Sequence, residues 1–238
     1  METSNTRHHI SHKFDQEMES LRNQVLKMGG LVEQQISQAI ETLQNMDAAG
    51  AEQVILRDQK VNTLEVVIDE ACIRILAKRQ PAASDLRMVV AVIKTITDLE
   101  RIGDEAEKIA KMALHLAEKD GRFRTRYAGV RHLGDLVIKM VHDALDAYAR
   151  LDVDAALKVV RADDVVDGEY QGLIRMLMTY MMEDPRTISE VLDIIWAARA
   201  LERIGDHAKN IGEYVIYLVK GKDIRHIDLD DVEKDIFS

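Results

Sequence analysis

An internal repeat constrains this chain more than any other feature of its sequence. Residues 99–109 read LERIGDEAEKI and residues 201–211 read LERIGDHAKNI, so eight of eleven positions agree. The second copy begins 102 residues after the first, close to half of the 238-residue chain. A repeat at a fixed spacing indicates that one structural unit is used twice. It also places the same pair of carboxylates, Glu-x-x-x-Asp, in both units.

Composition and apolar spacing predict a helical chain. Only 2 Pro and 12 Gly occur, and the abundant straight-chain residues favour helices. Apolar side chains recur at intervals of three and four, whereas no sustained period-two alternation predicts a strand. We therefore expect six long helices, over about residues 10–46, 52–79, 85–118, 128–150, 155–182 and 188–219.

The breaks between these helices fall at matching places in the two halves. Pro81 ends the second helix and Pro185 the fifth, because the residue before a proline avoids helical geometry. We expect Ser84 to cap the third helix and an aspartate of the turn 151–154 to cap the fifth. The segment 119–127 is the candidate linker. Short connections imply antiparallel neighbours, so the sequence predicts an all-α protein of two tandem three-helix bundles, residues 1–120 and 121–238.

Charge, cysteine content and hydropathy exclude several classes of protein. The net charge of −10 disfavours nucleic-acid binding, which needs a basic surface. Cys72 is the single cysteine and cannot form an internal disulfide, so we interpret it as a small buried hydrophobe in a reducing compartment. The longest apolar run, 88–93, is far shorter than the roughly 20 residues that span a bilayer. Any role at a membrane therefore requires a partner.

The repeated carboxylates are candidate metal ligands. Residues four apart share one helix face, and the helix before each repeat carries a second polar pair at the same spacing. Antiparallel packing could place the two pairs opposite each other in both halves. The candidate ligands are Asp58, Asn62, Glu100 and Asp104 in the first half and Asp163, Asp167, Glu202 and Asp206 in the second. Oxygen ligands suit iron(III), manganese or magnesium, whereas no Cys or His pair is spaced for zinc. An ordinary solvated helix face is the alternative interpretation.

Other residues of the repeat have less distinctive patterns. Gly103 and Gly205 are costly within a helix and indicate close approach of another backbone or of a metal cluster. Arg101 and Arg203 are expected to pair with acids on a neighbouring helix or on a partner. We interpret His207 as a bystander, because position 105 of the other copy is Glu. Trp196, the only tryptophan, is expected in the core or in a dimer interface.

Longer motifs resemble those of the PhoU family, and the resemblance covers essentially the whole chain. They are Met28-Gly29-Gly30 with Val32-Glu33, the run 77–81 (AKRQP), the run 84–87 (SDLR), both LERIGD copies, and the run 177–182 (LMTYMM). The resemblance implies two tandem three-helix bundles, often dimeric, in the cytoplasm and recruited peripherally to the inner membrane through partners. It implies a regulator beside the phosphate-specific ABC importer, contacting the ATPase subunit and the sensor domain of the phosphate-responsive histidine kinase.

The family pattern also bears on the metal site. Its acidic motifs can hold metal clusters, and they fall on Glu100/Asp104, Glu202/Asp206 and Asp163/Asp167. The fourth pair departs from the pattern, since Asp58 is matched with Asn62, and a neutral amide binds a hard cation more weakly than a carboxylate.

We therefore expect a non-enzymatic adaptor that represses the phosphate-starvation response and restrains phosphate uptake when phosphate is plentiful. One alternative is a ferritin-like di-iron or metal-handling protein. That class uses Glu-x-x-His pairs on bundle helices, and this chain contains none. A helical scaffold without metal is the other alternative.

Overall fold

The structure is a computed structural model that describes residues 3–81, 83–119, 128–225, 227 and 229. Within these residues the protein consists of helices, turns and irregular connections, as the sequence predicts. The long helices are α1 (Thr3–Asn45), α2 (Ala48–Arg79), α3 (Ala83–Ala117), α4 (Ala128–Arg150), α5 (Val153–Glu183) and α6 (Ile188–Lys220), and a short 3-10 helix, η2 (Pro185–Thr187), precedes α6.

Side-chain caps and a proline set the helix ends. Asp47 accepts a hydrogen bond from the Gly50 amide at the start of α2, and Asp152 caps α5 through the amide of Ala155. Gln80, with φ of +48°, terminates α2 immediately before the proline. The predicted aspartate cap of the fifth helix is thus confirmed. Ser84, by contrast, lies within the first turn of α3, because that helix begins at Ala83.

The predicted helix bounds are close to the observed ones, and the differences are local. Helix α1 begins at Thr3, several residues before the expected start at about residue 10, and α2 begins at Ala48, before the expected start at about residue 52. The predicted domain boundary at 120/121 lies in segment 120–127, outside the described residues. The division into units 1–120 and 121–238 therefore stays a prediction.

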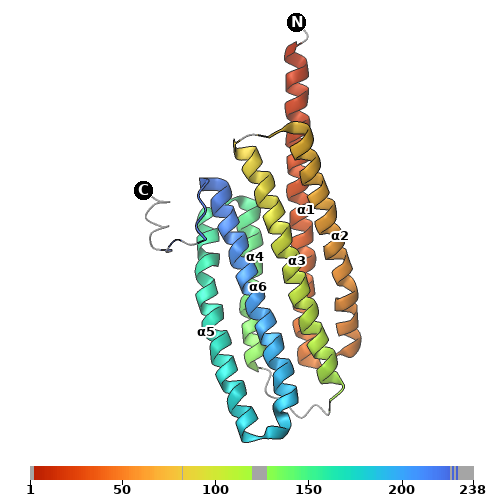
Figure 1. Ribbon diagram of the computed structural model, residues 1–238, viewed down its shortest axis with the longest axis vertical. Helices are drawn as coiled ribbons and strands as arrows, with labels where there is room; N and C mark the ends of the chain where they lie inside the picture. The colour runs from red at the N-terminus through yellow and green to blue at the C-terminus, as the bar shows by residue number, and fades with distance from the viewer. Residues whose placement is uncertain (1–2, 82, 120–127, 226, 228, 230–238) are drawn as a thin grey trace.

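The six helices form two adjacent bundles in an elongated molecule (Figure 1). Helices α1, α2 and α3 pack against one another, and α4, α5 and α6 do the same. The bundles meet through α3 and α6, which run side by side in opposite directions, and through a smaller contact between α1 and α4. The two helices that carry the repeated motif are therefore the helices that join the two halves.

Polar contacts fix the register of α3 against α6. Lys119 Nζ lies 2.6 Å from Asp193 Oδ2 at one end of the pair. Near the other end, Lys94 Nζ lies 5.3 Å from the ring centroid of Tyr214. Between them, Glu105 Oε1 lies 3.1 Å from Arg203 Nε, which confirms the expected pairing of that arginine with an acid on a neighbouring helix.

One continuous apolar core runs through both bundles. Cys72 is fully buried in it, and burial raises the pKa of its thiol to about 12, in agreement with the structural interpretation. Gly29 lies where α1 meets α4, and a Cβ there would lie 2.6 Å from Leu145 Cδ2. Glycine at this position therefore allows α1 and α4 to approach closely, and a larger side chain would obstruct that contact.

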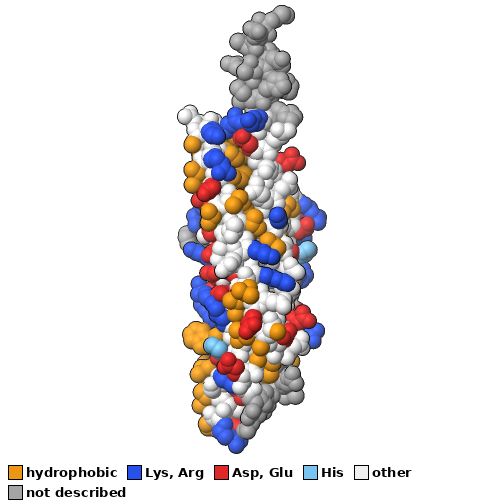
Figure 2. Space-filling view, turned by 90° about the vertical axis from the view of Figure 1, so that its right-hand side faces the viewer, with side chains coloured by type: hydrophobic (Ala, Val, Ile, Leu, Met, Phe, Trp, Pro, Cys, Tyr) orange, Lys and Arg blue, Asp and Glu red, His pale blue; other side chains and the backbone are white. Residues whose placement is uncertain are grey.

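The described surface carries exposed hydrophobic side chains on α2, α5 and α6. The α2 face is the one turned to the viewer in Figure 2, where hydrophobic patches alternate with charges of both signs. Met178 and Met182 are 51% and 84% exposed and are therefore not part of the core, whereas Met176 and Met181 pack against it. Trp196 is 63% exposed and so is not a core residue either. No helix among the described residues is long and apolar enough to cross a membrane.

Candidate functional site

The first carboxylate cluster lies between α2 and α3, where the antiparallel arrangement brings the two polar pairs together. It consists of Asp58, Asn62, Glu65, Glu100 and Asp104. Asp58 is only 6% exposed, and its two oxygens accept hydrogen bonds from the Gln35 amide at 2.9 Å and the Asn62 amide at 3.0 Å. These neutral donors satisfy the buried carboxylate without cancelling its charge.

Crowding of like charges is the main electrostatic property of this cluster. Burial raises the pKa of Glu100, and the charges of Asp104, Glu65 and Asp58 raise it further. Burial likewise raises the pKa of Asp104, with Asp58 as the next contribution. Glu65 shows the same direction, through burial and then through Asp69 and Asp104. Each of these carboxylates therefore lies within range of the negative charges of the others.

Glycine in the repeat allows this close approach. A Cβ at Gly103 would lie 3.0 Å from Asp58 Oδ1 and 3.3 Å from Val61 Cγ1. The equivalent position, Gly205, would bring a Cβ to 3.1 Å from Val166 Cγ1. Each glycine therefore accommodates side chains of the preceding helix of its own bundle.

The second carboxylate cluster lies between α5 and α6 and consists of Asp163, Asp167, Glu202 and Asp206. Burial raises the pKa of Glu202, and Asp206 adds to that shift more than Asp167 and Asp163 do. The pKa of Asp206 is raised by loss of hydration and then by Asp163 and Asp167. The structure thus brings all eight residues predicted from the sequence into two equivalent clusters.

Two cations distinguish the second cluster from the first. Lys209 Nζ lies 2.6 Å from Asp163 Oδ2, and the Arg199 guanidinium donates to Glu202 Oε1. The first cluster has amides, from Gln35 and Asn62, where the second has charges. At the four positions predicted from the sequence, the second cluster therefore has four carboxylates and the first has three. The second cluster also contains the two counterions.

The donor atoms of both clusters fit a hard cation. Asn62 Oδ1, Asp163 Oδ1 and Glu202 Oε2 are buried oxygens without a hydrogen-bond partner. Buried oxygens without partners are unusual and favour an ion or water as the missing neighbour. As the side chains stand in the described part of the chain, no three His, Cys, Asp or Glu residues are arranged as a ready-made set of ligands. Metal binding by these residues therefore stays a prediction, and it requires the carboxylates to turn inward.

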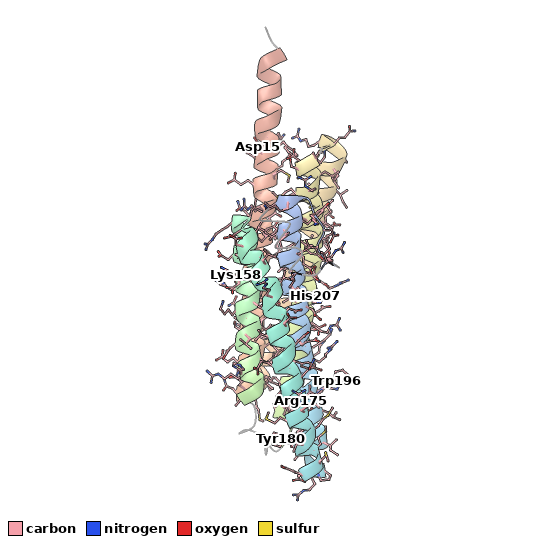
Figure 3. The ribbon with its side chains drawn as sticks, turned by 90° about the vertical axis from the view of Figure 1, so that its left-hand side faces the viewer. Asp15, Lys158, Arg175, Tyr180, Trp196 and His207 are labelled. Carbon is pink, nitrogen blue, oxygen red and sulfur yellow. The ribbon has the colours of Figure 1, made fainter. Side chains whose placement is uncertain are left out.

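The repeat is asymmetric at the bundle interface. Glu105 of α3 pairs with Arg203 of α6, but the equivalent position on α6 is His207, which is buried and donates from Nδ1 to Asp98 Oδ1. Asp98 in turn corresponds to Ala200 in the second copy. His207, interpreted from the sequence as a bystander, therefore links the two bundles (Figure 3).

Sequence reasoning missed Gln35, Lys209 and Arg199 as neighbours of the clusters. Lys209 and Arg199 each lie three residues from an acid of the motif, a spacing that places them on a neighbouring part of the same helix surface. Oppositely charged residues at this spacing occur on many helices, so the spacing alone does not identify Lys209 and Arg199 as neighbours of the cluster. Gln35 comes from α1 and carries no local signal, because its contact with Asp58 spans 23 residues.

Comparisons with known proteins show which family this chain resembles over its length. The PhoU domain matches residues 25–113 and 130–215, one copy for each bundle. The phosphate-specific transport system accessory protein PhoU homolog of Pseudomonas aeruginosa is 54% identical over 229 residues, covering 96% of this chain and 94% of the relative. The PhoU accessory protein of Escherichia coli is 50% identical over 234 residues, covering 98% and 96%.

Solved structures show the same fold. The crystal structure of PhoU from Pseudomonas aeruginosa has a TM-score of 0.83 and covers 88% of this chain and 100% of that chain, at 54% identity. The phosphate transport system regulatory protein PhoU from Streptococcus pneumoniae has a TM-score of 0.82 at 30% identity, covering 88% and 98%. With two domain matches and relatives of this identity over nearly its full length, the chain belongs to the PhoU family.

Proposed function

We propose that this protein is an accessory protein of a phosphate-specific transport system and acts as an adaptor without enzymatic activity. It contacts the ATPase subunit of the phosphate ABC importer and the sensor domain of the phosphate-responsive histidine kinase. When phosphate is plentiful it represses the starvation response and restrains uptake. The observation that carries the proposal is the 50% identity to an accessory protein of such a system over 98% of this chain.

The architecture suits an adaptor. Two bundles joined along α3 and α6 leave long helical sides exposed, so separate faces are available to separate partners. Signalling requires that the two complexes respond differently to the transport state, because coupling is a difference in affinity between states. We propose a cytoplasmic homodimer that is recruited to the inner membrane through these partners.

In this proposal the two carboxylate clusters hold iron, manganese or magnesium. The first cluster would use Asp58, Asn62, Glu100 and Asp104, and the second Asp163, Asp167, Glu202 and Asp206. A bound cation would brace α2 against α3 and α5 against α6 by neutralising crowded carboxylates. The unpartnered buried oxygens and the raised pKa values of the glutamates support this role.

The test of repression is alkaline phosphatase activity in a strain that lacks the gene, grown with ample phosphate. High activity that falls when the gene is restored supports the proposal, whereas low activity in both strains contradicts it. The double variant Glu100→Gln/Asp104→Asn in the restored gene then reports whether the first cluster is needed. Asn23→Asp, an exposed change on α1 away from both clusters, is the matched control.

Metal content is tested separately, on protein purified without a histidine tag. Elemental analysis that finds iron, manganese or magnesium in the wild type, and less in a variant that combines Glu100→Gln/Asp104→Asn with Glu202→Gln/Asp206→Asn, supports the metal role. A redox assay on iron-loaded protein addresses the ferritin-like alternative, since catalytic oxidation of iron would contradict a purely structural metal. Unchanged affinity for both partners after chelation would contradict the bracing role.

A further inference from the structure

An apolar stripe along α6 ends at the exposed tryptophan. Ile188, Leu192 and Trp196 are four residues apart, so they share one helix face, and they are 41%, 43% and 63% exposed. Exposed hydrophobic side chains aligned in this way mark interaction surfaces more often than scattered ones do. Figure 3 shows Trp196 standing out from the side of the bundles, away from Lys158.

A pocket adjoins the tryptophan between α3 and α6. It has a volume of about 270 Å³, and Met112 and Ala200 contribute apolar lining next to Trp196. Glu105 and the three cations Lys108, Arg199 and Arg203 complete the wall. A groove between two antiparallel helices with an aromatic anchor beside it has the shape that receives a third helix.

The charges at this pocket are arranged with cations outside and carboxylates beneath. The side chains of Lys108, Arg199 and Arg203 are about half exposed, at 51%, 48% and 49%. Their internal partners are buried, with Glu105 at 4% and Glu202 at 10%. A protein with a net charge of −10 therefore presents three cations around one apolar groove.

We propose that the groove beside Trp196 receives an acidic amphipathic helix of a partner protein. The apolar face of that helix packs on Trp196 and the Ile188–Leu192 stripe, and its carboxylates meet Lys108, Arg199 and Arg203. Tryptophan and arginine are the residues that most often dominate such interfaces. The inference rests on the proposed adaptor function, because it assigns a surface to one of the two partners.

A second copy of this chain is a poorer occupant. In a two-fold symmetric dimer built on this groove, the same patch faces itself. Lys108, Arg199 and Arg203 of one copy would then meet the same three cations of the other, and like charges in contact oppose association. An acidic helix from a different protein carries the complementary charge.

Trp196 provides its own probe, because it is the only tryptophan of the chain. Trp196 fluorescence of the full-length protein is measured during titration with the purified ATPase subunit and with the purified kinase sensor domain. It is also measured while the protein alone is diluted. The same titrations with the Trp196→Phe variant measure the fluorescence of the partner, which is then subtracted. We expect one partner to shift the Trp196 emission to shorter wavelength and to protect it from acrylamide quenching.

Calorimetry measures the affinities in parallel. Trp196→Ala, at an exposed position, is expected to weaken binding of that partner by about tenfold or more. Lys108→Ala and an increase to about 0.5 M salt are expected to weaken it as well, since rim charges are screened by salt. Lys158→Ala, an exposed lysine on α5 outside the groove, is the matched control. Circular dichroism confirms that each variant is folded.

The outcomes separate this inference from the proposed function. Binding of both partners by calorimetry, with Trp196 unprotected and Trp196→Ala without effect, overturns the groove while leaving the adaptor function intact. If neither partner binds, the adaptor function is contradicted, and the groove proposal is overturned with it. Spectral changes on dilution of the protein alone identify a second copy as the occupant and also overturn the proposal.

Discussion

Asp98 Oδ1 lies 2.7 Å from His207 Nδ1, although 109 residues separate the two in the chain. Asn210 Nδ2 donates to the same oxygen at 3.1 Å, and both residues of the pair are buried between α3 and α6. The Tyr214 hydroxyl is a further neighbour, and its pKa is raised by burial and by Asp98. This polar contact sits in the interface that unites the two bundles.

Removal of Asp98 is expected to destabilise the protein strongly. Asp98→Ala leaves His207 and Asn210 without their buried acceptor, and the loss is about 2–4 kcal/mol in the free energy of unfolding. A double-mutant cycle with His207→Ala, followed by chemical denaturation, should give a coupling energy of about 1–3 kcal/mol. The exposed pair His132–Glu169 is the control and should couple by less than about 1 kcal/mol. Equal coupling in both cycles would contradict the prediction.

Glu213 is expected to make stability fall as pH rises through the weakly acidic range. Burial raises its pKa to about 7, although Lys209 and Arg225 act in the opposite direction. An acid with a raised pKa in the folded state binds its proton more tightly there than in the unfolded state, where the pKa is about 4.3. The folded protein therefore loses stability between these two values as pH increases.

Glu213→Gln removes this titration. The variant is expected to gain stability relative to the wild type as pH rises from about 5 to 7, by on the order of 2–3 kcal/mol, with a constant difference above that range. Thermal unfolding across pH 4.5 to 8.5 measures it. Glu52→Gln, at an exposed position on α2, is the control. A difference between Glu213→Gln and the wild type that does not vary with pH would be inconsistent with a raised pKa.

Asn62→Asp is expected to strengthen manganese binding at the first cluster. The change turns the Asp58/Asn62 pair into two carboxylates. Added ligand charge raises the affinity for a hard cation, here by about tenfold or more. The variant should be less stable than the wild type in chelator, because it adds a negative charge beside Asp58 and loses the 3.0 Å amide donor. Calorimetric titration with manganese measures the affinity, and Asn23→Asp controls for net charge. Unchanged affinity would argue against metal at this cluster.

Lys209→Met is expected to make the second cluster depend on metal. Burial lowers the pKa of Lys209, but the hydrogen bond and charge of Asp163 outweigh it and the net shift is upward. Loss of the lysine leaves a buried carboxylate unpaired, so stability in chelator should fall by about 2–4 kcal/mol. Added manganese should restore more stability to the variant than it adds to the wild type. Equal effects of manganese on both proteins would contradict metal binding by Asp163.

Two glycines should respond oppositely to alanine. Gly30 lies within α1 with no atom in reach of an added Cβ, so Gly30→Ala should stabilise the protein by about 0.5–1 kcal/mol. At Gly103 the added methyl meets Asp58 and Val61, which are buried, so Gly103→Ala should destabilise by about 1 kcal/mol or more. Urea denaturation compares the two. Stabilisation by both changes would show that α2 can move away from α3 at little cost.

Much of the fold follows from local sequence. The bounds of α4 match the predicted range 128–150, and the capping role of Asp152 was expected from the turn 151–154. Helix-forming interactions act within about four residues, so they are written in neighbouring positions of the chain. The matched pairs Glu100/Asp104 and Glu202/Asp206 were predictable for the same reason.

The surroundings of those pairs were not predictable. Gln35 reaches Asp58 from another helix, and no local pattern indicates that contact. Lys209 was overlooked because a lysine near an aspartate is common on helix surfaces. Trp196 does not lie in the core, since its face of α6 looks outward beside the pocket and not toward the other helices, and its place in a dimer interface stays a prediction.

The sequence by itself determined six helices, their breaks, the repeated carboxylates and membership of the PhoU family. Only the tertiary structure decided how α3 meets α6, and with it the pairing of Asp98 with His207, the cations around Trp196 and the counterion Lys209 at Asp163. The physical reason is one of range. Helix propensity and periodicity depend on neighbours in the chain, whereas register between helices depends on the packing of side chains about a hundred residues apart.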